Sequence, residues 1–410
     1  SEWFAEHGFI NEAIRHAMAA SDVARAVYLI KLHRQTMLNK DRWFIFEKWL
    51  TRIPESEIEQ HPELLLARVW TYYYQNKNAA IPPILAAVEA LLRHQPEEQP
   101  LYGEIYLFKA VFSFWQGDAT NSLKYIEKAL ERIPETQAMV RGFAEIYLGL
   151  AGHMNGQTKT VVKVLSDLLD HSSLEAPRKV RVMIALVWVH LLSADLAAAS
   201  IRNRQLIETA SKNKLAPFIS WGSYNQGIIH FCRNELDLAI HHFNRAAETG
   251  YLILKRTSVD CLAGLALAHQ AKQQPDIADQ MIERLFELID SLNDPTLLEI
   301  ALTCKNRMLL MRGESMLEHH LVGPGQGPDM QPIVFYIEIP AITDCRILMA
   351  KGSTVDLKEA EKRLASFIQL NRTHQNTFRT IELMALQSQV AVSYTHLTLP
   401  TKEDEWGGGG

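Results

Sequence analysis

The sequence of 410 residues contains little cysteine and no long hydrophobic run. The most apolar run is Val182–Ala194. It is much shorter than the roughly 20 residues that a helix needs to cross a bilayer. No secretory leader is visible in residues 1–30, so we expect a cytoplasmic protein without a membrane partner. A disulfide framework or zinc knuckle is not expected, and a reducing compartment is favoured, because the cysteines are far apart and form no CxxC pair. The four are Cys232, Cys261, Cys304 and Cys345.

An excess of positive charge is also missing. The 42 Lys and Arg residues are outnumbered by 47 Asp and Glu residues, which gives a formal net charge of −5. Because a surface that coats nucleic acid is normally basic, we expect no direct DNA binding by this chain. Hydrophobic residues make up 47% and charged residues 22%, a composition typical of a folded rather than a disordered protein.

Motifs that carry a known chemistry are absent from the sequence as well. It contains no HExxH zinc motif, no GxSxG nucleophile elbow and no GxxxxGK[ST] phosphate loop. The pairs His241-His242 and His319-His320 cannot each chelate one metal, because adjacent residues on a helix point about 100° apart. No helix follows directly after GPGQGP (323–328), so a connector is favoured over a phosphate cradle. We therefore expect no enzymatic activity, no metal and no cofactor in this chain.

What the sequence does contain is a repeat. Short turn signals recur along the chain at a nearly constant spacing. A period of about 40 residues, with a helix on each side of the turn, is typical of an α-solenoid. The sequence therefore predicts an all-α, right-handed superhelix of tetratricopeptide-like helix–turn–helix repeats. The predicted turns are centred on Asn76, Gly117, Gly156, Ala194, Asn234, Gln273, Gly313 and Gly352.

The repeat pattern also suggests how the chain is organised. Residues 1–61 are expected to form an irregular helical cap, and residues 62–393 the repeat array. The array is interrupted at 321–336, where three glycines and three prolines exclude a helix. Residues 394–410 lack a helical period and end in four glycines, so we expect a non-native or disordered tail. The expected helices are 62–75, 79–95, 101–116, 119–133, 136–155, 158–171, 177–193, 195–212, 216–232, 235–249, 251–271, 275–292, 295–312, 340–351, 356–370 and 373–393.

Aromatic residues gather on the first helix of several expected pairs. First helices typically line the concave face of a two-helix solenoid, where ligands bind. An aromatic platform with planar polar groups suits a sugar, which offers an apolar face and a rim of hydroxyls. The alternative is that most of these aromatics pack between repeats. The candidate ligand-binding residues are Arg141, Glu145, Trp188, Trp221, Tyr224 and Asn225.

Two segments resemble a known family. Residues 1–30 and 337–364 are similar to parts of the sensor arm of MalT-like, LuxR-type bacterial transcriptional activators. The second segment contains a "Pro, then Thr–x–x–Arg–x–Leu–x–Ala" run formed by Pro340, Thr343, Arg346, Leu348 and Ala350. In that family the arm lies between an N-terminal signal-transduction ATPase and a C-terminal helix-turn-helix. ATP would be expected only in that separate N-terminal module, because this chain has no phosphate loop.

The resemblance implies a function without catalysis. The chain would be a sensor and scaffold that binds an inducer, such as an oligosaccharide, or a protein partner in its groove, and controls self-association of the parent protein. Two alternatives stay open. One is a generic tetratricopeptide scaffold for protein–protein interaction, unrelated to transcription. The other is an enzyme built in a helical toroid, for which we find no convergent carboxylates or histidines.

Overall fold

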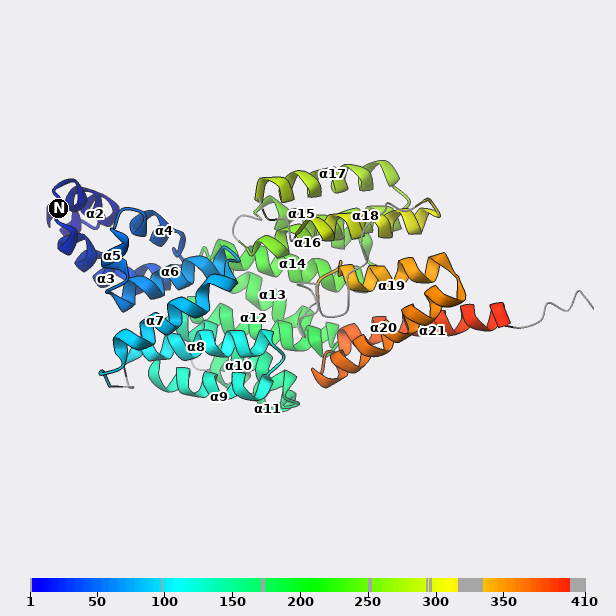
Figure 1. The fold of residues 1–410 in the computed structure, drawn as a ribbon, viewed down its shortest axis with the longest axis horizontal. Coiled ribbons are helices and arrows are strands. Elements are labelled where there is room, and N and C mark those ends of the chain that lie inside the picture. Colours follow the sequence, from blue (N-terminus) through cyan, green and yellow to red (C-terminus); the bar gives the residue numbers. More distant parts are fainter. Residues whose placement is uncertain are drawn as a thin grey trace, which may run out of the picture. The chain divides into compact units, whose positions relative to one another are not determined.

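The computed structural model describes residues 2–96, 99–170, 174–249, 253–292, 294, 297–315 and 335–398, and for residues 394–398 only the backbone. Every regular element in these ranges is a helix (Figure 1). This confirms the predicted all-α solenoid class. The described helices also include none with the length and apolarity needed to cross a membrane.

The chain forms two compact units. The first unit consists of residues 1–189, 201–222 and 250–255, and the second unit of residues 190–200, 223–249 and 256–410. Helix α14 (Ala216–Cys232) runs without interruption from the first unit into the second. Residues 1–61, the expected cap, are part of the first unit.

The helices up to α13 lie wholly or mainly in the first unit. Helices of uneven length precede Pro62, and paired helices follow from it. In order they are α1 (Glu2–Glu6), α2 (Ile10–Ala19), α3 (Val23–Asn39), α4 (Phe44–Leu50), α5 (Glu55–Ile58), α6 (Pro62–Tyr74), the 3-10 helix η1 (Asn78–Ala80), α7 (Ile81–Leu92), α8 (Pro100–Trp115), α9 (Ala119–Arg132), α10 (Ala138–Met154), α11 (Thr158–Asp170), α12 (Ala176–Leu192) and α13 (Leu196–Lys212).

The remaining helices belong to the second unit, apart from the first residue of α16. They are α15 (Leu236–Glu248), α16 (Lys255–Ala271), α17 (Pro275–Leu292), α18 (Leu298–Arg312), α19 (Pro340–Lys351), α20 (Thr354–Thr373) and α21 (Thr377–Thr398). Helix α21 continues past Ser393, where the sequence pattern placed the end of the array. Most of the predicted interruption, the pair His319-His320 and residues 399–410 lie outside the described residues.

All eight predicted turn centres have a positive φ. The angles lie between 57° and 82°, in the left-handed region that ends a helix. At Gly117 the amide of Asp118 donates to the carbonyl of Ser113 over 2.9 Å, and at Gln273 the amide of Gln274 donates to the carbonyl of His269 over 3.0 Å. This bond satisfies a free carbonyl at the helix end. The turn geometry therefore repeats even where the residue is not glycine.

Small residues allow the helices of a pair to pack closely. An added Cβ at Gly227 would lie 2.5 Å from the ring of Phe243, and one at Gly264 would lie 2.8 Å from the same ring. The phenyl ring thus fills the space left by two glycines on neighbouring helices. This close approach explains why small side chains recur in the repeat.

Candidate functional site

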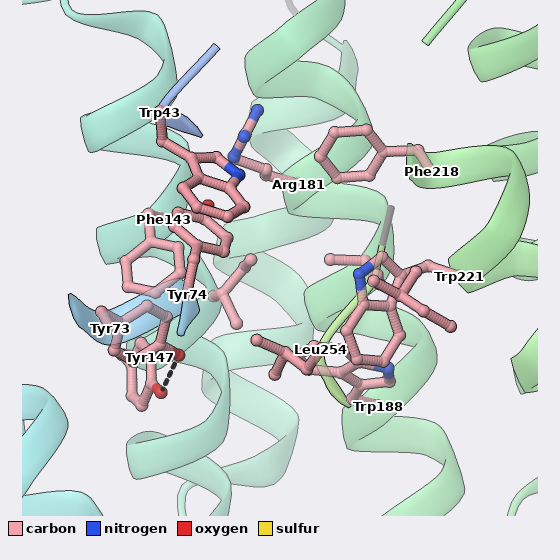
Figure 2. Close-up of a pocket in the computed structure, with 13 residues that line it drawn as sticks. Trp43, Tyr73, Tyr74, Phe143, Tyr147, Arg181, Trp188, Phe218, Trp221 and Leu254 are labelled. Atoms are coloured by element: carbon pink, nitrogen blue, oxygen red, sulfur yellow. Dashed lines mark hydrogen bonds between the residues drawn. The ribbon is translucent and has the colours of Figure 1, made fainter. Parts of the chain in front are cut away.

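An aromatic cavity of about 90 Å³ lies within the first unit (Figure 2). Apolar and aromatic side chains form nearly all of its lining. Most of them come from the first helices of four pairs, α6, α10, α12 and α14. The lining residues are Trp43, Tyr73, Tyr74, Phe143, Ile146, Tyr147, Arg181, Ile184, Trp188, Phe218, Trp221, Ile253 and Leu254.

One wall of the cavity is a cluster of rings in mutual contact. Trp43, at the N-cap of α4, stacks on Tyr74 with ring centroids 4.7 Å apart and planes at 9°. Tyr73 meets Phe143 edge to face at 5.3 Å, and its hydroxyl lies 3.2 Å from the hydroxyl of Tyr147. Such offset and edge-to-face pairs add about 0.5–1.5 kcal/mol beyond burial. These contacts fix the rings as a preformed surface.

The opposite wall contains two tryptophans. Trp188 on α12 and Trp221 on α14 pack edge to face at 5.2 Å. Figure 2 shows Leu254 between these rings and the tyrosines of the other wall. Leu254 directly precedes α16, so a residue far along the chain completes the lining.

Arg181 is the charged member of the lining, and its side chain is only 3% exposed. Its guanidinium pairs with Asp41, donates to the carbonyl of Pro177 over 2.8 Å and lies 4.8 Å from the centroid of the Phe218 ring. Asp41 offsets its charge. Burial raises the pKa of Tyr74 well above its ordinary value, although Arg181 opposes this. The cavity therefore presents neutral rings and hydroxyls, which suit an uncharged molecule with an apolar face.

Two of the sequence-predicted site residues, Trp188 and Trp221, line this cavity. Arg141 and Glu145 do not. Glu145 is buried, and Arg178 Nε lies 2.9 and 3.0 Å from its two carboxylate oxygens. Burial raises the pKa of Glu145, and Arg178 opposes the shift. Arg141 donates to the carbonyls of Leu130 and Ile133. Both residues make contacts that join helices, outside the cavity lining.

Tyr224 and Asn225 also lie away from the cavity lining. Both are fully buried and belong to the second unit. The Tyr224 hydroxyl donates to Asp260 over 2.8 Å. The spacing of four between Trp221 and Asn225 predicted one shared binding face, but burial places Asn225 in the helix packing. These two candidates therefore lie in the packed interior of the second unit.

Among the lining residues not predicted from the sequence are Trp43, Arg181 and Leu254. Trp43 lies in the segment predicted as a cap, Arg181 is next to the apolar run of α12, and Leu254 is in a connector. None of them has a local pattern that indicates a ligand. Only their convergence in the folded chain makes them part of one cavity.

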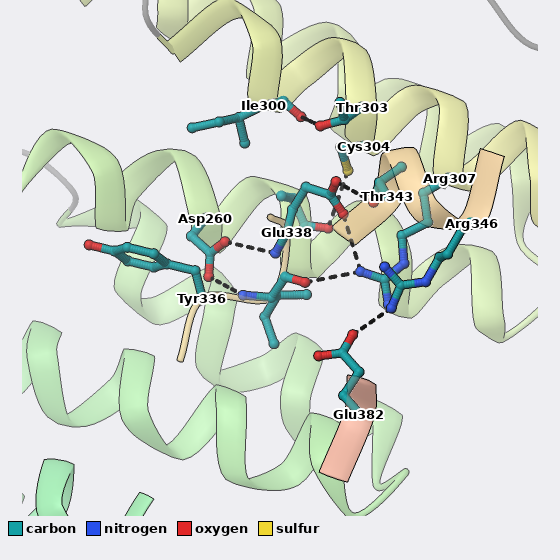
Figure 3. A network of polar contacts seen from close by, with 12 residues as sticks. Asp260, Ile300, Thr303, Cys304, Arg307, Tyr336, Glu338, Thr343, Arg346 and Glu382 are labelled. Atoms are coloured by element: carbon teal, nitrogen blue, oxygen red, sulfur yellow. Dashed lines mark hydrogen bonds and ion pairs between the residues drawn. The ribbon is translucent and has the colours of Figure 1, made fainter. Parts of the chain in front are cut away.

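The second unit contains a buried polar network around a non-helical segment, Phe335–Ile339 (Figure 3). Asp260 on α16 accepts from the amides of Ile337 (2.8 Å) and Glu338 (3.2 Å). Arg307 on α18 donates to the carbonyl of Ile337 over 3.0 Å and to the Glu338 carboxylate over 3.1 Å. Helix side chains thus satisfy backbone groups that a helix would otherwise satisfy internally.

The family-like run at 340–350 takes part in this network. Thr343 donates to the buried Glu338 carboxylate over 2.7 Å, and Arg346 pairs with Glu382 on α21. Burial would raise the pKa of Glu382, but Arg379 and Arg346 lower it to about 2. The run therefore has a structural role. Among the described residues, no three His, Cys, Asp or Glu side chains converge as metal ligands.

Comparison with known proteins gives two kinds of similarity. The family described as "MalT-like TPR region" matches residues 103–394. The HTH-type transcriptional regulator MalT of Yersinia enterocolitica is 25% identical over 160 residues, which cover 38% of this chain and 18% of the relative. The MalT regulator of Cronobacter sakazakii is 25% identical over 163 residues, covering 40% and 18%. The match thus spans less than a fifth of these curated relatives.

A solved structure has a similar fold. It is a Rap protein complexed with Competence and Sporulation Factor, with a TM-score of 0.51 and 15% identity. The similarity covers 95% of this chain and 99% of that chain. At this identity the likeness concerns the fold alone.

Proposed function

This chain belongs to the family of MalT-like TPR regions, and from that premise we propose that it is the sensor arm of a bacterial LuxR-type transcriptional regulator. The matching relatives are named as HTH-type transcriptional regulators. In this proposal the arm works in the cytoplasm, without catalysis. ATP hydrolysis and DNA binding belong to other modules of the parent protein.

The observation that carries the proposal is the aromatic cavity of the first unit, which is lined by first helices. Its rings are held in place by each other, and its one buried cation is paired with Asp41. An inducer with an uncharged, ring-shaped face fits this chemistry, and an oligosaccharide is one such molecule. The volume of about 90 Å³ is smaller than the roughly 150 Å³ of an engineered cavity that holds benzene. The cavity would therefore hold one edge of the inducer while the rest stays at its mouth.

Binding would act by shifting the population of two states of the arm. A ligand that contacts the cavity in one state more favourably than in the other favours that state, whereas a ligand with equal affinity for both shifts nothing. The favoured state would control self-association of the parent protein.

A protein partner is the second candidate for what the arm binds. The similar Rap structure contains a bound factor, and tetratricopeptide-like repeats provide extended surfaces for partners. A generic interaction scaffold unrelated to transcription would use the same fold. Capture of a partner alongside a flat response to small molecules would favour this alternative.

A thermal-shift panel of oligosaccharides, with nucleotides as a second class, tests the inducer proposal. A ligand at 100 times its Kd stabilises the folded state by about 2.7 kcal/mol. The same ligand should change the fluorescence of Trp43, Trp188 and Trp221, which line the cavity.

Trp188→Ala should remove both responses. Trp3→Phe is the matched control, because Trp3 is exposed and outside the cavity lining, and it should keep them. A response that survives Trp188→Ala would rule out the cavity as the ligand site.

A further inference from the structure

The aromatic cavity and the polar network are joined by two short stretches of chain that both end at one carboxylate, Asp260. The first stretch is helix α14. Trp221 lines the cavity, and one helical turn later Tyr224 donates its hydroxyl to Asp260 Oδ2 over 2.8 Å. Because a continuous helix is stiff, a movement of Trp221 along the helix axis carries Tyr224 with it.

The second stretch is the start of α16. Ile253 and Leu254 line the cavity, and α16 begins at Lys255. Arg256, in the first turn, lies 3.9 Å from the centroid of the Tyr336 ring and donates to the carbonyl of Glu338 over 2.7 Å. Only Lys255 separates Leu254 from Arg256. A displacement of Leu254 must therefore change the backbone at Lys255 or shift the first turn of α16.

Asp260 lies one turn after Arg256. Its carboxylate contacts Tyr224 from the first stretch and Arg256 from the second. Arg256 Nη1 lies 3.2 Å from Asp260 Oδ1. The carboxylate is fully buried, and it accepts from the amides of Ile337 and Glu338. A buried amide that loses its acceptor keeps the full penalty of its desolvation. Asp260 is therefore the acceptor for two amides of the segment Tyr336–Glu338, whose carbonyls accept from Arg256 and Arg307.

We propose that occupancy of the aromatic cavity is transmitted through Asp260 to the segment Tyr336–Glu338. This inference rests on the proposed function of the cavity as the ligand site, and it adds the route by which that site controls the second unit. Leu254 and Trp221 are positioning residues on this route. By reciprocity, a change at Asp260 alters the cavity by the same coupling free energy.

Amide hydrogen exchange in the full chain tests the route without any ligand. The readout is the exchange rate of the Ile337 and Glu338 amides, followed by mass spectrometry. Leu254→Ala and the milder Leu254→Met and Trp221→Phe should each accelerate this exchange. Coupling energies of 1–3 kcal/mol correspond to changes of about 5- to 150-fold, and the mild variants should fall at the lower end.

Phe143→Leu is the matched control. Phe143 lines the same cavity from α10, which is on neither stretch, so the exchange of both amides should stay within about twofold of the wild type. Equal acceleration by Phe143→Leu and Leu254→Ala would overturn the route, because exchange would then follow general loosening. No acceleration by any Leu254 or Trp221 variant would overturn it as well.

Asp260→Asn provides the reciprocal test. It should change the fluorescence of the cavity tryptophans, and combining it with Leu254→Ala should add no further exchange, because both changes act on one coupling. Additive effects would overturn the proposal. The outcome distinguishes this route from the proposed function. A ligand that binds the cavity but leaves the exchange of the Ile337 and Glu338 amides unchanged would contradict the route only. A Leu254 effect in a chain that binds no ligand would contradict the sensor proposal only.

Discussion

The two units are built from the same helical repeats, but their interiors contain different kinds of side chain. The first unit gathers aromatic rings around a cavity, and its buried charges join one helix or turn to another, as Arg34 on α3 does with Glu104 on α8. The second unit uses buried charges to hold a non-helical segment. Seven of the eight tryptophans lie in the first unit, and the eighth, Trp406, is outside the described residues.

The difference follows from the connections between helices. In the first unit each helix pair follows the last after a short connector, so most residues lie within helices. In the second unit a long connector separates α18 from α19, and its last residues, Phe335–Ile339, are buried or half-buried without helical bonds. Buried backbone groups need partners. The charged side chains of neighbouring helices supply these hydrogen-bond partners, which hydrocarbon rings could not.

The largest expected effect is in the second unit. Glu338→Ala removes a fully buried carboxylate and leaves the partly buried Arg307 guanidinium without it, which should cost about 3–5 kcal/mol. Urea unfolding followed by circular dichroism should show the loss, while the tryptophan fluorescence transition, which reports the first unit, should shift by a smaller amount. Glu359→Ala on the exposed face of α20 is the control and should cost less than about 1 kcal/mol. Equal shifts of both transitions would show that the units do not unfold separately.

The counterpart in the first unit is Glu104. It is fully buried, pairs with Arg34 and accepts from the Trp70 indole over 2.7 Å. Glu104→Gln keeps an acceptor but removes the charge, so we expect a loss of about 2 kcal/mol, seen as an earlier tryptophan fluorescence transition. A circular dichroism shift without a fluorescence shift would contradict the assignment of this pair to the first unit's stability.

A smaller effect concerns the response of the second unit to acid. Burial lowers the pKa of His242 to about 4, helped by the stacked His230 ring 5.3 Å away. Between the ordinary value of 6.5 and about 4 the folded form binds fewer protons than the unfolded form, so stability is complete above pH 6.5 and falls as the pH falls. The loss should be roughly 1 kcal/mol, because the ring is only partly buried and solvent screens it.

His242→Phe tests this assignment because phenylalanine keeps a stacked ring but cannot be protonated. Urea unfolding at pH 7.5 and at pH 5 should show a smaller difference in the variant than in the wild type. An unchanged difference would assign the acid response to other groups.

The smallest expected effect is at an exposed ion pair of the second unit. Arg312 Nη2 lies 2.9 Å from Asp279 Oδ1, and the Asp279 side chain is 52% exposed. Asp279→Ala should cost no more than about 0.5 kcal/mol, because solvent screens the pair. The contrast with Glu338→Ala, measured in the same urea titration, would separate burial from mere ion-pair formation. Similar losses in both variants would contradict that view.

The repeat could be predicted from the sequence because its signals are local. A turn residue followed by a helix start recurs with a regular period, and the structure places a positive φ at Gln273 and Ala194 just as at Gly117. The candidate site was predicted only in part. Trp188 and Trp221 line the cavity. Glu145 and Asn225 occupy similar positions in the helical pattern, but both are buried among the helices.

The sequence by itself determined the helices, their pairing and the regular period of the turns, because each depends on bonds and contacts within one repeat. The tertiary structure decided where rings and charges meet. Trp43 and Leu254 share a cavity although they are far apart in the sequence, and Asp260 reaches Ile337 in the same way. Such long-range contacts depend on how successive repeats stack, which cannot be predicted from a local sequence pattern.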